Sequence, residues 1–278
     1  MSGTPERRVA WTGRGMAASD GAGVKLTRVI GQPALPDLDP FLMLDEFGSD
    51  DPKAYIAGFP DHPHRGFETV TYMLAGRMRH KDNKGNEGLL TSGSVQWMTA
   101  GRGIVHSEMP EQEHGLMQGF QLWLNLPARD KMTAPRYQDI APELIPVTEP
   151  APGVTAKVIA GELKGVKGPV EAGATEPFYA DLRLQPGSGL QVDLPSGHNA
   201  FAYVYEGAAE IAGRPVERGT IAVLTPEGPV DLKSDHGGRL ILAAGKPLRE
   251  PVAKYGPFVM NTEGELRQAF ADYQAGRF

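Results

Sequence analysis

The apolar residues of this chain fall in short clusters of strand length. Turn-forming Gly, Pro or Asp residues bound each cluster, and β-branched and aromatic residues are frequent within it. This pattern predicts strands at residues 25–30, 41–44, 69–74, 178–184, 201–205, 220–224 and 239–243. The 35 glycines and 24 prolines are spread along the chain, which is typical of many short strands joined by tight turns. We therefore expect an all-β protein.

Two strand-turn units occur twice, in the same order, once in each half of the chain. Residues 72–76 (YMLAG) resemble residues 203–207 (YVYEG), and residues 93–97 (GSVQW) resemble residues 219–223 (GTIAV). The repeat indicates a duplication. Each half is long enough to close into an antiparallel barrel, a closure that removes exposed strand edges.

The domain organisation follows from this repeat. The length of 278 residues leaves both two β-rich domains and one large barrel open, and the duplication favours two. We expect domains at residues 1–130 and 131–278, connected through the Pro- and charge-rich stretch 127–152.

One helix is predicted, at residues 263–275. Thr262 and Glu265 form a capping-box pattern at its start, and Gly276 would end it. The residues that fall on one face of this helix are Leu266, Ala269, Phe270 and Tyr273. Because the helix follows the second barrel, we expect it to pack on a barrel face.

Charge and cysteine content exclude several classes of function. The formal net charge of −6 provides no general positive field, so direct binding of nucleic acid is not expected. The local basic cluster at residues 77–81 alternates with Met78 and is interpreted as the solvated end of a strand. The absence of cysteine excludes disulfides, thiolate catalysis and cysteine-based metal sites, so any metal must bind through nitrogen and oxygen.

No apolar run approaches the roughly 20 residues that a membrane-spanning helix needs, and the N-terminus carries no signal-peptide core. We therefore expect no membrane association and a cytoplasmic location.

Two closely spaced pairs of metal-ligating residues stand out in the first half. In an extended chain, residues i and i+2 point to the same side, so His62 and His64 can reach one point, and so can His106 and Glu108. Pro63 stiffens the first pair without needing to donate a hydrogen bond. If the two pairs lie on neighbouring strands, they supply three imidazoles and one carboxylate. This set suits Fe, Mn, Ni, Cu or Zn, and an octahedral ion would keep two open positions.

Glu68 competes with Glu108 for the carboxylate position. The segment from His62 to Glu68 also fits the H-x-H-x3-E motif of the wider cupin superfamily, in which that glutamate binds metal. From the residues alone, both alternatives stay open.

Two long segments, residues 59–70 and 96–110, resemble the hallmark motifs of the pirin family, and residues 121–127 and 254–262 also match it. The resemblance covers most of the chain and implies two tandem cupin domains. It also implies that His62, His64, His106 and Glu108 bind one divalent metal ion, iron above all, with Glu68 outside the ligand set.

In pirins the second cupin has usually lost its metal site. The repeat register places Asp193, Pro195 and Leu232 at the corresponding ligand positions here. His198 and His236 are interpreted as surface residues.

The resemblance to pirins further implies a function. Some bacterial pirins are similar to quercetin 2,3-dioxygenases, which open the central ring of a flavonol with O2 and release CO. Glu108 would then accept the proton of the flavonol hydroxyl group, and Phe47, Phe59 and Met98 are candidate walls of the substrate pocket. The alternative is a redox sensor, in which the metal regulates a protein partner such as a transcription factor or a metabolic enzyme and no substrate turns over.

Overall fold

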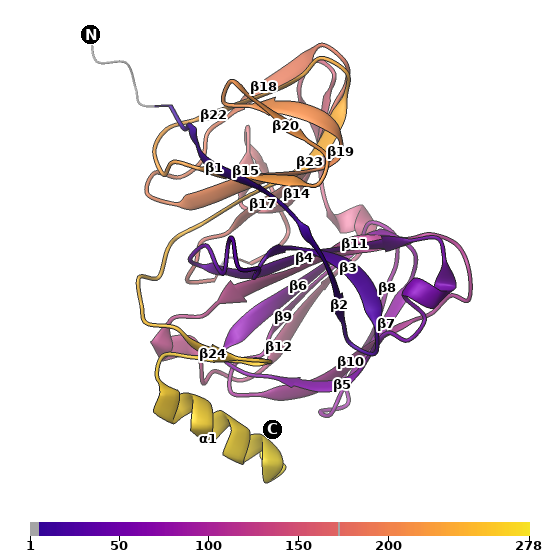
Figure 1. The fold of residues 1–278 in the computed structure, drawn as a ribbon, viewed down its shortest axis with the longest axis vertical. Coiled ribbons are helices and arrows are strands. Elements are labelled where there is room, and N and C mark those ends of the chain that lie inside the picture. Colours follow the sequence, from indigo (N-terminus) through magenta and orange to yellow (C-terminus); the bar gives the residue numbers. More distant parts are fainter. Residues whose placement is uncertain (1–5, 172) are drawn as a thin grey trace. The chain divides into compact units, whose positions relative to one another are not determined.

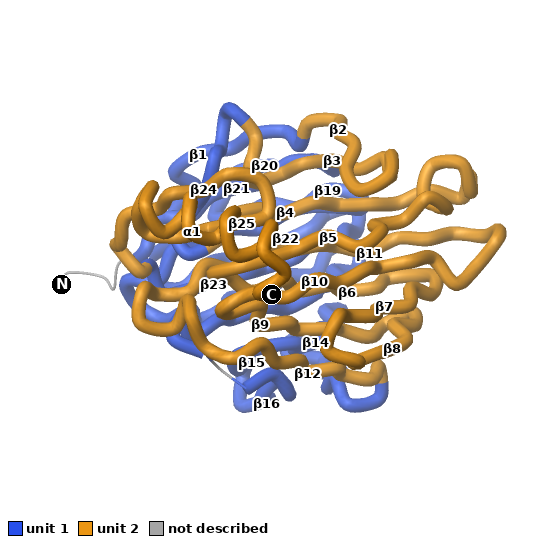
Figure 2. The backbone as a smooth tube through the Cα atoms, turned by 90° about the horizontal axis from the view of Figure 1, so that it is seen from below, with its two compact units in different colours: residues 1–15, 33–40, 143–247 blue, residues 16–32, 41–142, 248–278 orange. Residues whose placement is uncertain are grey.

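The computed structural model describes residues 6–171 and 173–278, and most of these lie in β-strands. The chain forms two compact units, coloured separately in Figure 2. Unit 1 comprises residues 1–15, 33–40 and 143–247, and unit 2 comprises residues 16–32, 41–142 and 248–278. These units differ from the contiguous ranges 1–130 and 131–278 expected from the sequence, because each one includes a segment from the opposite end of the chain.

The barrel of unit 2 is formed by two antiparallel sheets (Figure 1). The larger sheet has the order β12 (Arg136–Ile140), β9 (Val95–Thr99), β6 (Phe67–Ala75), β11 (Met117–Asn125), β4 (Phe41–Ser49), β3 (Val24–Ile30), β2 (Met16–Asp20). The smaller sheet has the order β5 (Phe59–His64), β10 (Ile104–Pro110), β7 (Met78–Asp82), β8 (Glu87–Leu90). Short 3-10 helices at Pro52–Ala54, Ala128–Asp130 and Pro142–Leu144 lie in the connections.

Unit 1 repeats this arrangement. Its larger sheet has the order β1 (Val9–Arg14), β21 (Thr220–Leu224), β19 (Asn199–Ile211), β23 (Gly238–Gly245), β17 (Phe178–Leu184), β14 (Val154–Ala160), β13 (Val147–Ala151). The second layer consists of β18 (Ser188–Val192), β22 (Val230–Ser234), the far end of β19, and β20 (Arg214–Glu217). A small hairpin is formed by β15 (Glu162–Leu163) and β16 (Val166–Lys167).

The strand registers confirm the duplication. Tyr72 pairs with Val95 in unit 2, and Tyr203 pairs with Ile221 in unit 1, each partner lying two residues after the repeated glycine. The N–H of Gly93 donates to the Met73 carbonyl at 2.7 Å, and the N–H of Gly219 donates to the Val204 carbonyl at 2.7 Å. The two units can therefore be compared residue by residue along their paired strands.

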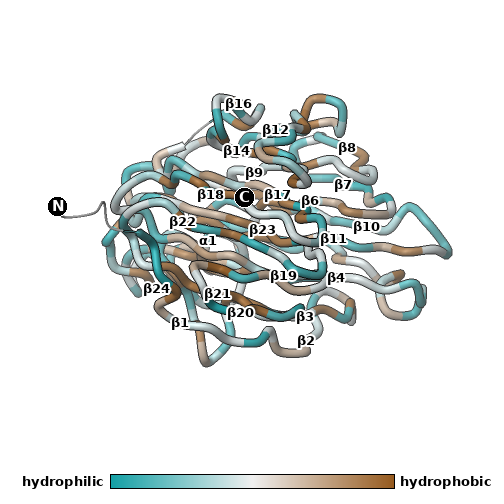
Figure 3. Tube along the Cα trace, turned by 90° about the horizontal axis from the view of Figure 1, so that it is seen from above, coloured by the Kyte–Doolittle hydropathy of each residue, from teal (hydrophilic) through white to brown (hydrophobic). Residues whose placement is uncertain are grey.

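Alternation along the strands explains why these segments pair as they do. Apolar colours follow the strands and polar colours gather in the loops between them (Figure 3). In unit 1 the inward residues of both layers form one continuous apolar core, mostly of Val, Leu, Ile and Ala side chains, which includes Val158, Leu182, Leu232 and Leu242. Burial of such side chains is the main stabilising contribution to a β-sandwich of this kind.

The N-terminal segment belongs to unit 1, where hydrogen bonds of Arg7 hold it. The guanidinium of Arg7 is almost fully buried and donates to the carbonyls of Pro195, His198, Thr225 and Gly228. A buried cation satisfied by carbonyl dipoles in this way holds the segment in place, and β1 then extends the sheet beside β21.

The C-terminal segment belongs to unit 2. It forms the hairpin of β24 (Ala253–Tyr255) and β25 (Phe258–Met260), followed by α1 (Glu263–Gln274). The capping box of Thr262 and Glu265 is present, which confirms the predicted start of the helix. The helix, expected with the second domain, instead contacts the hairpin of unit 2.

Two cations tie this segment to the barrel of unit 2. Arg65 donates to Asp272 on α1 at 2.7 Å and lies over the ring of Phe278. Lys131 is buried and donates to the carbonyls of Gly66 and Val259 and to the side chain of Asn125 at 2.6–3.0 Å. The hairpin is thereby held where its residues contribute to the wall of the cavity described below.

Candidate metal centre

Three of the four expected metal ligands meet at one point in unit 2. His62 and His64 lie on β5, and His106 lies directly opposite His62 on the neighbouring strand β10. Each residue offers a ring nitrogen, and these three nitrogens all lie within 4.8 Å of one another. Because β5 is the edge strand of its sheet, Pro63 fits between the two histidines without removing a needed hydrogen bond.

The protonation pattern of these rings fits a metal ion. Nδ1 of His62 lies 2.8 Å from the carbonyl of Pro60, which leaves its Nε2 free. Nδ1 of His64 and Nε2 of His106 are buried, and neither has a hydrogen-bond partner within the described residues. Burial lowers the pKa of both His64 and His106 well below the usual range, so both rings are neutral near pH 7. Neutral imidazoles with unpartnered, converging nitrogens are the donors that a divalent transition metal takes.

Glu108 lies on the same strand as His106, two residues further along, and its side chain is buried. Its carboxylate accepts a hydrogen bond from Thr71 at 3.0 Å, and the side-chain amide of Gln121 lies at 3.4 Å. Both histidines of β5 and Glu108 line one cavity. The role of Glu108 as the fourth ligand stays a prediction.

Glu68 lies on the other face of the sheet. On β6, Glu68 and Thr71 are three residues apart, so their side chains point in opposite directions, and Thr71 is the one that contacts Glu108. Glu68 is instead fully enclosed, where it accepts hydrogen bonds from Trp97 Nε1 at 3.0 Å and Thr99 Oγ1 at 2.7 Å. Burial raises the pKa of this carboxylate.

A cavity of about 800 Å³ opens above the histidines. Two of the expected wall residues, Phe47 and Phe59, line it, together with Trp123 and the hairpin residue Tyr255. Met98 was also expected there, and this expectation is wrong. Its side chain is buried in a separate cluster with Ala100 and Ile104, because β9 lies beyond the strands that form the cavity wall.

Comparison with known proteins bears on the identity of the chain. The family model for pirin matches residues 23–124, and the model for the pirin C-terminal cupin domain matches residues 179–278. A Pseudomonas aeruginosa protein named "Putative quercetin 2,3-dioxygenase" is 55% identical over 269 residues, which cover 94% of each chain. The chain belongs to the pirin family.

Other proteins similar to this pirin support the same assignment. A Caulobacter vibrioides protein named "Pirin-like protein" is 50% identical over 275 residues, covering 99% of this chain and 100% of its own. The crystal structure of a quercetin 2,3-dioxygenase from Acinetobacter baumannii matches with a TM-score of 0.92 at 34% identity, covering 99% of both chains. The expected all-β architecture of two cupin domains is thereby confirmed.

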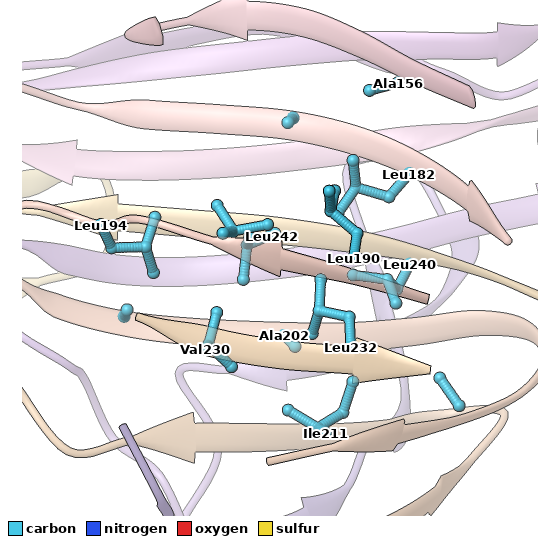
Figure 4. Close-up of a cluster of buried hydrophobic side chains, with 14 of the residues drawn as sticks. Ala156, Leu182, Leu190, Leu194, Ala202, Ile211, Val230, Leu232, Leu240 and Leu242 are labelled. Atoms are coloured by element: carbon cyan, nitrogen blue, oxygen red, sulfur yellow. The ribbon is translucent and has the colours of Figure 1, made fainter. Parts of the chain in front are cut away.

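The second cupin of this pirin has aliphatic side chains where unit 2 has its polar site. The strand registers of the two units give the counterparts directly, since each pairing in unit 2 has an equivalent in unit 1. The residues equivalent to His62, His64, His106 and Glu108 are Val192, Leu194, Val230 and Leu232. All four are buried in the core of unit 1, and three of them are labelled in Figure 4.

The sequence comparison of the two halves was therefore displaced. The repeated glycine aligns Leu232 with His106, whereas the strand registers make Leu232 the counterpart of Glu108. Asp193 and Pro195 are each one residue away from the true counterparts, and a shift of one residue turns a strand side chain to the opposite face. Asp193 is exposed and pairs with Lys164 at 3.0 Å. His198 was expected on the surface but is buried, whereas His236 is exposed as expected.

His80 is a functional candidate that the sequence interpretation missed. It lies opposite Glu108 on β7, is almost fully buried, and places its Nδ1 3.3 Å from Nδ1 of His106. If His106 offers Nε2 to a metal, its Nδ1 carries the proton and donates to His80, which fixes the tautomer of the ligand. The solvated-strand interpretation holds for Arg77 and Lys81, which are exposed. The signal for His80 was its position two residues after Met78, on the same face of the strand.

Proposed function

We propose that this pirin is an iron-dependent dioxygenase that acts on flavonols, of the quercetin 2,3-dioxygenase type. His62, His64, His106 and Glu108 would hold one Fe2+ ion, and the cavity above them would hold the flavonol. The same donor set also suits Mn, Ni, Cu and Zn, so the ion that the cell supplies decides the loading. We propose a cytoplasmic location. No helix in the described part of the chain is long and apolar enough to cross a membrane.

The observation that carries this proposal is the contrast between the two units. Three histidines with free nitrogens converge in unit 2, two of them, His62 and His64, line a cavity, and the equivalent positions in unit 1 are aliphatic. The fold itself therefore does not require polar side chains there. The names of the similar proteins from Pseudomonas aeruginosa and Acinetobacter baumannii support the choice of reaction.

The residues of the chain would divide the work as follows. An iron ion at this site would supply Lewis acidity toward the 3-hydroxyl oxygen of the flavonol and the redox chemistry that reaction with O2 requires. Glu108, held by Thr71, would accept the proton that the hydroxyl group loses. Aromatic walls such as Phe47 and Phe59 would exclude water from the bound ring system.

The overall reaction balances without a further reductant. The flavonol would be oxidised and both atoms of O2 incorporated into the product, while one carbon of the central ring leaves as CO. The substrate thus provides all the electrons, and the protein needs no second cofactor.

The test is to produce the protein anaerobically with Fe(II), measure the metal content, and then follow quercetin loss and CO release in air. About one metal ion per chain with CO release is expected. His62→Ala should abolish both metal and activity, whereas His114→Ala, which removes an exposed histidine outside the cluster, should change neither. Glu108→Gln keeps the shape of the side chain and should lose most of the activity. Full activity in that variant would exclude Glu108 as the base.

Metal binding without turnover would exclude the dioxygenase. That result would support the alternative function, in which the metal acts as a redox-dependent regulator of a protein partner.

A further inference from the structure

A row of polar side chains crosses the inner face of the larger sheet in unit 2. Thr71 on β6 lies opposite Gln121 on β11, Gln121 lies opposite Asp45 on β4, and Asp45 lies opposite Arg28 on β3. All four residues line the cavity above the histidines. The row begins at the metal centre, because Thr71 contacts Glu108.

Hydrogen bonds connect the members at both ends of the row. The hydroxyl of Thr71 has one proton, which it shares between Glu108 and the side-chain oxygen of Gln121, 2.6 Å from Thr71 Oγ1. At the other end, Arg28 forms a forked pair with Asp45, with Nε to Oδ1 at 3.0 Å and Nη2 to Oδ2 at 2.7 Å. Arg28 also donates to the more exposed Asp20 at 2.8 Å.

Unit 1 shows that the fold does not need this row. The same register comparison gives Ala202, Leu242, Ala180 and Val158 as the residues equivalent to Thr71, Gln121, Asp45 and Arg28. All four are fully buried members of the apolar core of unit 1, and Ala202 and Leu242 are labelled in Figure 4. A sheet of this architecture is therefore stable with aliphatic side chains at every position of the row.

The ion pair is also a poor source of stability. The side chain of Asp45 is 3% exposed, and desolvation of a buried pair commonly costs as much as the mutual attraction returns. Burial raises the pKa of Asp45 even though Arg28 opposes the shift. A polar pair that is dispensable for the fold, costly to bury, and placed on a cavity wall is best explained by binding.

The pair can still bind a ligand. Its internal bonds use Nε and Nη2 of Arg28, and Nη1 has no partner within the described residues. Each oxygen of Asp45 accepts one bond from Arg28 and retains a lone pair. A donor and an acceptor thus stand side by side, which is the arrangement that recognises hydroxyl groups on an aromatic ring.

We propose that Arg28 and Asp45 form a second recognition subsite, which binds a ring hydroxyl group of the ligand remote from the hydroxyl group at the metal centre. This inference rests on the proposed function, because it takes the ligand to be a hydroxylated aromatic molecule. Asp45 lies two strands from Thr71, roughly 10 Å by strand spacing, which is the scale of a molecule of two or three rings. Leu26 and Phe47 form an apolar wall beside the pair, against which the ring would lie.

The test compares two flavonols that share the 3-hydroxyl group. Quercetin carries further hydroxyl groups on both outer rings, and 3-hydroxyflavone carries none. Binding to Zn(II)-loaded protein, which cannot turn over, is measured by quenching of tryptophan fluorescence, since Trp123 lines the cavity. The wild type should bind quercetin at least about tenfold more tightly, as expected for hydrogen bonds to charged groups.

The decisive variant is R28M/D45L, which replaces both partners by apolar side chains of similar size. The ratio of its affinities for quercetin and 3-hydroxyflavone should fall to about one. Its metal content should equal that of the wild type, and its thermal midpoint should be at least as high. The control is K164M/D193L, which removes an exposed ion pair of unit 1 and should leave the preference unchanged.

Several outcomes would overturn the proposal. Equal binding of both flavonols by the wild type, or an unchanged preference in R28M/D45L, would show that the pair does not recognise the ligand. A large drop in the thermal midpoint would show that the pair is structural. Failure of the dioxygenase function is a separate result, since a protein that prefers quercetin in this assay but releases no CO retains the subsite and loses only the activity.

Discussion

The roles of Glu68 and Glu108 can be separated by substituting each in turn. Glu68→Leu removes the acceptor of two buried donors, Trp97 Nε1 and Thr99 Oγ1. Each donor left unpaired costs about 1–3 kcal/mol. Part of this loss is offset, because burial already raises the pKa of Glu68 and the carboxylate is therefore costly to bury. We expect a net loss of about 3 kcal/mol in the free energy of unfolding.

In a unit of this size, that loss corresponds to a fall of about 6–12 °C in the thermal midpoint. The metal stoichiometry should not change, because the Glu68 side chain points away from the face of β6 that carries Thr71. Glu108→Gln should do the reverse, weakening metal binding with little effect on the midpoint of the metal-free protein.

The assay combines thermal melts of the metal-free protein with elemental analysis after loading with Zn(II). Glu68→Gln serves as the conservative control, since an amide oxygen still accepts one hydrogen bond and the expected loss is about 1 kcal/mol. A folded Glu68→Leu protein that no longer binds metal would refute the assignment of the two glutamates. So would a Glu108→Gln protein with wild-type metal affinity.

Three further predictions concern the surroundings of the site. His80→Ala should retain one metal ion per chain but weaken Zn(II) binding at least about tenfold in calorimetry, because His106 loses the partner that fixes its tautomer; unchanged affinity would contradict this role. Burial lowers the pKa of Lys131 from 10.5 to about 8, so between these pH values the unfolded chain holds a proton that the folded chain has lost, and stability should rise with pH. Relative to Lys131→Met, the free energy of unfolding of the wild type, measured with urea, should rise by up to about 1.4 kcal/mol per pH unit above pH 8. If the free energies of both proteins changed with pH in parallel, the lowered pKa of Lys131 would be refuted. Asp272→Asn removes the charged partner of buried Arg65 and should destabilise unit 2 by about 1–3 kcal/mol in thermal melts, whereas Asp235→Asn, at an exposed position, should have little effect.

Local patterns in the sequence determined the elements and most of the candidate site. The strands predicted at 178–184 and 220–224 match β17 and β21, and the capping box of Thr262 and Glu265 marks the start of α1. The pairing of His62 with His64 depends only on the two-residue period of an extended chain, which is a property of neighbouring residues. The resemblance to pirins, carried by contiguous motifs, was likewise legible without a structure.

The tertiary structure decided which face each strand turns to the cavity. Glu68 and Glu108 have the same chemistry, and only the pairing of β6 and β10 with their neighbours places one at the histidines and the other behind the sheet. The position of His80 on the inner face is likewise set by strand pairing. Strand pairing also shows that the counterparts of His62 and His64 are Val192 and Leu194, one residue away from Asp193 and Pro195.

The sequence also did not predict that the N-terminal segment belongs to unit 1 and the C-terminal segment to unit 2. Arg7 and Lys131 hold the two terminal segments through contacts with residues up to 221 positions away. Local periodicity indicates which residues of a strand share a face, but not which of the two faces of the sheet that is. The pairing register between strands distant in sequence decides which face is turned to the cavity, because it is set by burial and hydrogen bonding. The candidate site of this pirin depends on that register.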